Sequence, residues 1–161
     1  MMVPLSLFAQ AKMPAWFYNS FRTLKLDQHY GISNFIKPSF LSADFNGDGS
    51  KDIAALIISK KNKKKGILII HQTSHKYFVM GAGVNFGNGG DDFNWAKGWK
   101  LYKDKVVYET VFDKDDNISG SKKNNLKHPG VYIYDLMDGE PNSGGVISCN
   151  GEKYIWIHQG E

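Results

Sequence analysis

The spacing of apolar positions changes once along the chain, and the change separates a helical start from a strand-rich remainder. Phe17, Phe21 and Leu24 repeat at the interval of one helical face, and Trp16 widens that apolar stripe. Proline is favoured at a first helical position, where its missing N–H costs nothing. The pattern predicts one helix over residues 14–26, beginning with such a proline.

Beyond that helix the apolar positions are typical of strands. Residues 53–58 are apolar on both faces, with Ile53, Ala55 and Ile57 on one face and the residues between them on the other. A strand of this kind is expected at the centre of a sheet that is covered on both sides. Strands are expected at residues 39–45, 53–58, 67–70, 76–80, 105–112, 130–136, 145–149 and 153–158, with a short turn or helix at 32–36 and a long polar loop at 113–129.

Two of the connections carry strong turn signals. Five lysines within residues 60–65 lie between two apolar strands and are interpreted as a hairpin tip. A solvated turn that discourages aggregation is the favoured reading of these lysines, and contact with an anionic surface is the alternative. Asn150-Gly151 separates the last two strands and predicts a hairpin with a type I′ turn, which needs positive φ at both central residues.

The strands are short, closely spaced and mostly consecutive, and no repeat of 20–50 residues is visible. The expected fold is therefore α+β, with an N-terminal helix packed on a mostly antiparallel β-sheet, and a β-sandwich is the alternative. A chain of 161 residues suggests one domain. That domain is expected over residues 12–161.

The first eleven residues resemble the end of an export signal. Residues 1–8 are apolar apart from Ser6, and Ala9-Gln10-Ala11 fits the small-x-small cleavage pattern. Residues 1–11 are therefore interpreted as a signal-peptide remnant, and a disordered segment or a buried N-terminal strand is the alternative. No other stretch approaches the 18 apolar residues of a membrane span, so a periplasmic or secreted location is expected.

Composition narrows the function without naming it. The single cysteine, Cys149, excludes an internal disulfide and falls in an expected strand, where a small buried thiol is ordinary. The net charge of +4 is mild. Nucleic-acid binders concentrate basic residues on one face or helix, so no nucleic-acid partner is expected.

One segment, residues 44–52, carries a pattern with defined chemistry. Oxygen-bearing side chains occupy its first, third, fifth and ninth positions, and Gly49 stands sixth, where a sharp turn lets the next carbonyl face a metal. Calcium takes six to eight oxygen ligands, and clustered carboxylates repel one another without a cation. A plain Asp/Asn/Gly turn is the alternative. The predicted ligands are Asp44, Asn46, Asp48, Asp52 and the carbonyl of Ser50.

This segment resembles the calcium loops of FG-GAP and integrin-α-type repeats, which also occur in VCBS-type repeats. Their pattern, Asp-x-Asp/Asn-x-Asp-Gly-x-x-Asp followed by an apolar strand, is matched within residues 41–58. The resemblance implies a loop that joins two strands and binds calcium through the same five residues. An EF-hand is not expected, because Ala55 stands where that motif has a bidentate glutamate.

Weaker constellations leave an enzymatic alternative open. The Gly-rich region 81–99 contains Asp91 and Asp92, which could supply acid chemistry or a second cation site, although a loop with Trp95 and Trp99 in the core is favoured. Asp113 and Asp115 are interpreted as a solvated turn. No nucleophile with a recognisable base is found, and the alternative is a small hydrolase with Asp91, Asp92, Glu109 or a histidine in its site.

Taken together, the residues predict an exported, calcium-binding, non-catalytic envelope protein that acts as a binding or interaction domain. Its partner is expected to be a protein or a glycan of unknown identity. A small envelope hydrolase with acidic residues in region 81–99 is the alternative.

Overall fold

The computed structural model describes residues 11–160, so the predicted signal-peptide remnant lies almost wholly outside the described residues. Within residues 11–160 the chain forms one α-helix, three short 3-10 helices and eleven strands, and the α+β prediction is confirmed. The helical elements are α1 (Ala15–Thr23), η1 (Leu26–Gln28), η2 (Gly87–Gly89) and η3 (Phe93–Trp95). The strands are β1 (Tyr30–Ile32), β2 (Phe40–Ala43), β3 (Asp52–Ser59), β4 (Lys65–Ile70), β5 (Tyr77–Gly81), β6 (Gly98–Tyr102), β7 (Val106–Phe112), β8 (Ile118–Asn125), β9 (Gly130–Met137), β10 (Glu140–Cys149) and β11 (Tyr154–Gln159).

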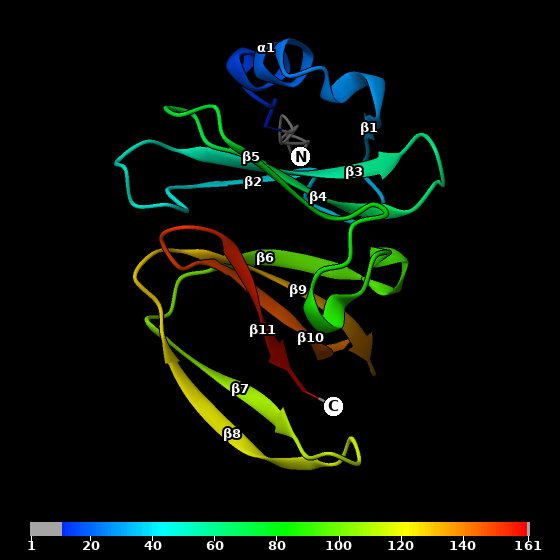
Figure 1. Ribbon diagram of the computed structural model, residues 1–161, viewed down its shortest axis with the longest axis vertical. Helices are drawn as coiled ribbons and strands as arrows, with labels where there is room; N and C mark the ends of the chain where they lie inside the picture. Colours follow the sequence, from blue (N-terminus) through cyan, green and yellow to red (C-terminus); the bar gives the residue numbers. More distant parts are fainter. Residues whose placement is uncertain (1–10, 161) are drawn as a thin grey trace, which may run out of the picture.

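The strands form two antiparallel sheets and one separate hairpin. The first sheet has the order β1-β3-β4-β5, and β2 pairs with β3 on the same edge as β1. The second sheet has the order β11-β10-β9-β6, and β7 pairs with β8. Figure 1 shows the resulting layers, with α1 above the first sheet, the second sheet beneath it and the β7–β8 hairpin below.

Three apolar cores fill the spaces between these layers. The core between the two sheets contains Leu56, Ile69 and Trp99, and the core between α1 and the first sheet contains Phe17 and Leu68. A smaller core joins the second sheet to the β7–β8 hairpin. The molecule thus combines the predicted helix-on-sheet packing with two sheets placed face to face.

Strand β3 confirms the prediction of a central strand covered on both sides. Ile53, Ala55 and Ile57 face the helix core, while Ala54 and Leu56 face the core between the sheets. All five are at most 1% exposed, because α1 covers one face of the strand and the second sheet covers the other. This double covering explains why β3 lacks the polar alternation of a half-exposed strand.

Several element boundaries differ from the sequence predictions. Helix α1 ends at Thr23 and the chain then forms η1, and Pro14 caps α1 instead of opening it. Of the short turn or helix expected at 32–36, Ile32 is the last residue of β1, which pairs with the edge of β3, and the chain bends at residues 35–39. The expected loop at 113–129 is also wrong, since residues 118–125 pair with β7 as strand β8. The β10–β11 hairpin is confirmed, but its turn is not type I′, because Gly151 has positive φ and Asn150 does not.

Candidate metal centre

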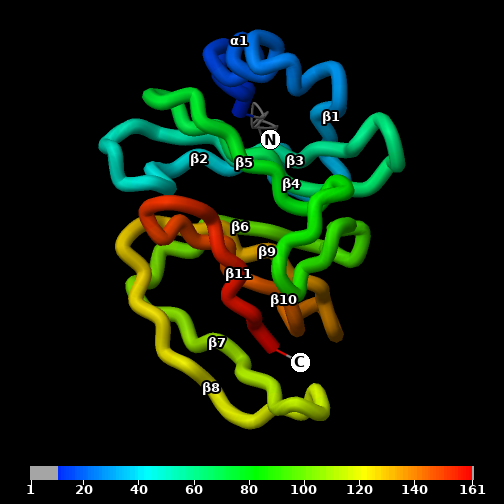
Figure 2. The backbone as a smooth tube through the Cα atoms, in the orientation of Figure 1, coloured from blue at the N-terminus to red at the C-terminus, as the bar shows by residue number. Residues whose placement is uncertain are grey.

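The candidate loop joins β2 to β3 at one end of the first sheet, as the sequence predicted. Ala43 and Asp52 pair across the two strands, so residues 44–51 are a hairpin loop closed by that pair. Figure 2 shows this turn and the lysine-rich turn after β3 on opposite sides of the molecule. The candidate ligands therefore belong to one short connection anchored in a buried strand.

The carboxylate of Asp44 lies at the centre of the loop. Its Oδ1 accepts hydrogen bonds from the backbone N–H groups of Gly47 at 2.7 Å and Asp48 at 3.1 Å, and its Oδ2 accepts one from Gly49 at 2.8 Å. Gly47 and Gly49 have φ values of +78° and +89°, which other residues rarely adopt. The loop thus curls around its first carboxylate, and the two glycines permit the curl.

Asn46 and Asp48 hold each other in place. Asn46 Oδ1 accepts from the backbone N–H of Asp48 at 3.1 Å, and Asn46 Nδ2 donates to Asp48 Oδ2 at 3.1 Å. Asp48 Oδ1 accepts from the backbone N–H of Ser50 at 2.8 Å. These hydrogen bonds, led by the one from Ser50, lower the pKa of Asp48. Asp48 is therefore ionised at neutral pH and exposed to solvent.

The carboxylate of Asp52 forms the buried base of the loop. The residue is 0% exposed, and its two oxygens accept from the backbone N–H groups of Phe45 and Gln72, each at 3.0 Å. Burial raises the pKa of Asp52, and the two hydrogen bonds oppose that rise. This carboxylate ties the loop to the turn that follows β4.

His71 and Tyr154 extend the site in a way that the sequence did not predict. Asn46 Nδ2 lies 3.1 Å from His71 Nδ1, and His71 Nε2 lies 2.7 Å from the Tyr154 hydroxyl. An amide nitrogen only donates, so Nδ1 accepts and the Nε2–H donates to Tyr154. Burial lowers the pKa of His71 and keeps this imidazole neutral. His71 therefore determines how the Asn46 amide is turned.

Two further contacts support the rim of the loop. Thr73 Oγ1 donates to Ser50 Oγ at 2.8 Å. The imidazole of His128 lies so close to Gly47 that a Cβ there would approach its Cε1 to 2.1 Å. Gly47 is thus required both for its backbone conformation and for the space that His128 occupies.

The chemistry of the donor set suits calcium, whereas the arrangement of the side chains is only partly that of a metal site. Asp44, Asp48 and Asp52 form no ion pair within residues 11–160, where the salt bridge present joins Lys64 to Asp91. In the same part of the chain, no three His, Cys, Asp or Glu side chains are placed so that they could hold a metal ion. The loop carboxylates instead accept hydrogen bonds from backbone amides. An ion bound here would have to compete with those hydrogen bonds.

The acids of region 81–99 have structural partners. Asp91 forms the ion pair with Lys64. Asp92 Oδ1 accepts from the backbone N–H of Lys65 at 3.0 Å and of Asn94 at 3.1 Å, so it caps η3. Asp113 likewise accepts from two backbone amides in the β7–β8 turn, as expected for a solvated turn. These contacts are typical of carboxylates that stabilise turns, and they do not support a role in acid catalysis.

The tryptophans of this region are mostly buried, as predicted. Trp99 is 2% exposed and donates its indole N–H to the carbonyl of Pro38 at 2.6 Å. Trp95 and Trp156 are half-buried and pack against the core between the sheets. Their ring centroids are 6.1 Å apart, and the rings meet edge to face. They do not form an open aromatic platform.

Other polar clusters also border cavities. Glu109 and His158 line a cavity of about 450 Å³ beside Lys122. Ser20 Oγ lies 3.0 Å from His75 Nδ1 beside another cavity of about 490 Å³. A hydroxyl–imidazole pair also needs a group that orients the imidazole, and no described residue hydrogen-bonds the other nitrogen of His75. Ser20 and His75 therefore lack the third member of a catalytic triad among the described residues.

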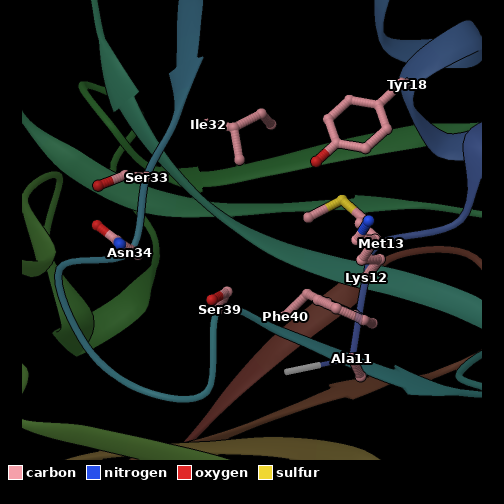
Figure 3. Close-up of a pocket in the computed structure, with 9 residues that line it drawn as sticks. All are labelled: Ala11, Lys12, Met13, Tyr18, Ile32, Ser33, Asn34, Ser39 and Phe40. Carbon is pink, nitrogen blue, oxygen red and sulfur yellow. The ribbon is translucent and has the colours of Figure 1, made fainter. Parts of the chain in front are cut away.

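A further cavity lies near the start of α1. Figure 3 shows Tyr18 of α1 and Phe40 of β2 beside it, with Ser33 and Asn34 on the segment between β1 and β2. Its volume is about 460 Å³, and Lys12 supplies the charge among its lining residues. The described lining contains no carboxylate, imidazole or thiol.

Comparison of the chain with protein-family models, with curated proteins and with solved structures finds no match. Among the helices of the described residues, none has the length and apolar character needed to cross a membrane. The functional argument therefore depends on the residues and contacts of this chain alone.

Proposed function

We propose that this chain is an exported, non-catalytic envelope protein that serves as a binding or interaction domain and is stabilised by one calcium ion. The ion binds in the loop between β2 and β3, which resembles FG-GAP and VCBS-type calcium loops. Its ligands are Asp44, Asn46, Asp48, Asp52 and the carbonyl of Ser50.

The observation that carries the proposal is the curl of the loop around Asp44. Three backbone N–H groups converge on this carboxylate, so the loop wraps around the first of its proposed ligands. The loop holds three carboxylates within nine residues, and none has an ion-pair partner among the described residues. A divalent cation would relieve their mutual repulsion.

The competing hydrogen bonds favour a weak, structural ion. Asp48 and Asp52 already accept hydrogen bonds from backbone amides. The free energy of calcium binding is therefore reduced by the free energy of the hydrogen bonds that the ion displaces. Extracellular calcium modules bind with Kd values of about 10⁻⁴–10⁻³ M. An exported protein meets calcium at such concentrations, and an ion of this affinity acts as a support for the loop.

The remaining parts of the proposal come from the sequence. The apolar start and the small-x-small pattern ending at Ala11 support export to the periplasm or the medium. The partner is a protein or a glycan. The hydrolase alternative has the weaker support, because Asp91 and Asp92 are engaged in turn contacts.

Thermal unfolding in calcium and in EDTA tests the calcium site. With a Kd of about 0.1 mM and about 1 mM calcium, binding adds roughly 1.4 kcal/mol to the free energy of unfolding. For a chain of this size that raises the Tm by about 3–6 °C. Asp44→Asn is expected to abolish the difference between the two conditions, because it removes the central carboxylate.

Asp113→Asn is the matched control, since Asp113 also accepts two backbone hydrogen bonds in a polar turn. The control variant is expected to keep the full calcium-dependent shift, even if both variants lower the Tm in EDTA. An identical melt of the unmodified chain in calcium and in excess EDTA would contradict the calcium site.

A further inference from the structure

The turn between β3 and β4 forms a basic patch, defined here as Lys60, Lys61, Lys63, Lys64 and Lys65. Two of these lysines have partners, because Lys64 pairs with Asp91 and the Nζ of Lys65 donates to Asn94 at 3.0 Å. Lys60, Lys61 and Lys63 have no carboxylate partner among the described residues. Because the amide of Asn94 is uncharged, Lys65 is not neutralised either, and four ammonium groups of the patch have no carboxylate partner among the described residues.

A cavity of about 560 Å³ lies beside this patch, between the β3–β4 turn, the start of β1 and the turn after β5. Its lining residues include two lysines and several residues with hydrogen-bonding side chains, and no Asp or Glu is among them. The polar lining residues are Gln28, His29, Tyr30, Ser59, Lys60, Lys61 and Asn62. The charge complement of such a cavity is an anion.

The cationic side of the cavity is held in place. Lys60 Nζ donates to the backbone carbonyl of Asp27 at 2.6 Å, and the backbone N–H of Lys60 donates to the carbonyl of His29 at 2.9 Å. An ammonium group has three N–H donors, so two remain for a ligand. A lysine fixed in this way loses less side-chain entropy on binding than a free surface lysine does.

The neighbouring amide is fixed as well. Asn62 Oδ1 accepts from the backbone N–H of Lys64 at 3.0 Å, which leaves its Nδ2 as the free donor. That nitrogen lies against Gly83, where a Cβ would approach it to 2.7 Å. Gly83 has a φ of +96°, so glycine is favoured there on both counts.

We propose that this cavity binds a phosphate group through Lys60, Lys61 and Asn62. Ammonium groups are compact point charges that suit an oxyanion with concentrated charge, whereas planar carboxylates are matched best by arginine. The cavity is large enough for the sugar or glycerol that carries the phosphate. The site lies at the opposite end of β3 from the candidate calcium loop and shares no residue with it, so either proposal can fail alone.

Titration of the full chain with inorganic phosphate, followed by two-dimensional ¹H–¹⁵N NMR at constant ionic strength, tests the site. Saturable shifts are expected at the amides of residues 29, 60–62 and 83. The double variant Lys60→Gln/Lys61→Gln is expected to weaken binding about tenfold, because it removes charge-assisted hydrogen bonds. The control Lys114→Gln/Lys123→Gln removes the same charge at exposed positions and is expected to bind as the unmodified chain does.

A pair of tryptophan variants distinguishes binding of phosphate inside the cavity from general electrostatic attraction of phosphate to the lysines. Val84 lines the cavity and is 43% exposed, so Val84→Trp fills the cavity without changing charge. Ile118 is 51% exposed on the distant β8 and provides the control Ile118→Trp. Loss of binding in the first variant alone supports the site. Equal weakening by the two lysine double variants, or unchanged binding in Val84→Trp, overturns it.

The source of the phosphate is decided by vesicle sedimentation. If Val84→Trp abolishes binding both to inorganic phosphate and to phosphatidylglycerol vesicles, with phosphatidylcholine vesicles as the blank, the ligand is a lipid headgroup. If only inorganic phosphate binds, the ligand is a soluble phosphate ester. Vesicle binding that Val84→Trp leaves unchanged, with no saturable phosphate shifts, overturns the proposal.

Discussion

At the scale of single residues, the buried His71 and the half-buried His158 show how hydrogen-bond partners decide the cost of burying a polar atom. His71 has a partner on each ring nitrogen. His158 is held less well, because its Nδ1 lies 3.4 Å from the indole N–H of Trp156 and its buried Nε2 has no hydrogen-bond partner among the described residues. Phe112 covers one side of its ring, with ring centroids 5.2 Å apart. Among the described residues, the Nε2 of the half-buried His158 is thus a buried polar side-chain atom that the fold leaves without a partner.

Replacement of His158 by phenylalanine is expected to flatten the pH dependence of stability below neutrality. Burial lowers the pKa of His158 in the folded chain, whereas an unfolded histidine titrates near 6.5. Between these values the unfolded chain binds a proton that the folded chain does not. Stability is therefore greatest above about pH 6.5 and falls as the pH falls, with a slope of at most about 1.4 kcal/mol per unit for one proton.

Urea unfolding between pH 5 and pH 7.5 measures that slope. Between pH 7.5 and pH 5, the free energy of unfolding is expected to fall no more steeply in His158→Phe than in the unmodified chain. At pH 5 the variant is expected to be at least as stable as the unmodified chain. The phenyl ring keeps the contact with Phe112 and removes the unpartnered nitrogen. Equal slopes in both chains would show that His158 does not titrate on unfolding.

At the scale of elements, a glycine in the middle of strand β10 makes room for a neighbouring aromatic ring. Gly145 is buried and lies beneath the indole of Trp156, where a Cβ would approach ring atoms to 2.3 Å. Trp156 in turn packs against Phe86, Phe93 and Trp95. A residue that usually weakens a strand is here what lets β10 and β11 pack around a large side chain.

Gly145→Ala is expected to lower the free energy of unfolding by about 1–3 kcal/mol, because the added methyl group would overpack a filled interior. Gly31→Ala in β1 is the matched control, since a Cβ there meets no atom within 4 Å and the residue lacks positive φ. The control is expected to be neutral or slightly stabilising. Urea unfolding of both variants measures the difference, and equal losses would contradict the role assigned to Trp156.

The elements that the sequence predicted well are those with a strong apolar pattern. Strands β3 and β4 and their lysine-rich turn follow from such patterns, and so does the helical face at Phe17 and Phe21. Strand β8 was missed because it is polar and mostly exposed and depends on its pairing with β7. Strand β1 is three residues long and likewise depends on β3. The local pattern of apolar and polar residues does not show which strands will pair with one another.

The candidate metal site also has a part that could be predicted from the sequence and a part that could not. Its loop residues are neighbours in sequence, so their spacing could be read directly. His71 and Tyr154 are 83 positions apart, and His128 reaches Gly47 from another loop, so only the fold brings them together. The charge of residues 60–65 was visible in the sequence, whereas the cavity beside it depends on residues 28–30 and 82–84.

At the scale of the whole molecule, β3 is the element shared by the two larger cores and by both proposed sites. Its two faces contribute to the core under α1 and to the core between the sheets. One of its ends carries the acidic loop and the other carries the basic patch, as Figure 1 shows for the turns on either side of the first sheet. Loss of β3 would therefore remove both sites together.

Neighbouring residues of β4 test whether the two cores unfold as one unit. Leu68 faces the helix core and Ile69 faces the core between the sheets, and both are 0% exposed. Leu68→Ala and Ile69→Ala are each expected to cost about 2–5 kcal/mol, because each leaves a cavity in a packed interior. Since β3 and β4 belong to both cores, each variant is expected to shift one cooperative transition. Far-ultraviolet circular dichroism and tryptophan fluorescence would then give the same midpoint, whereas an earlier separate transition in Leu68→Ala would mean that α1 detaches independently of the sheets.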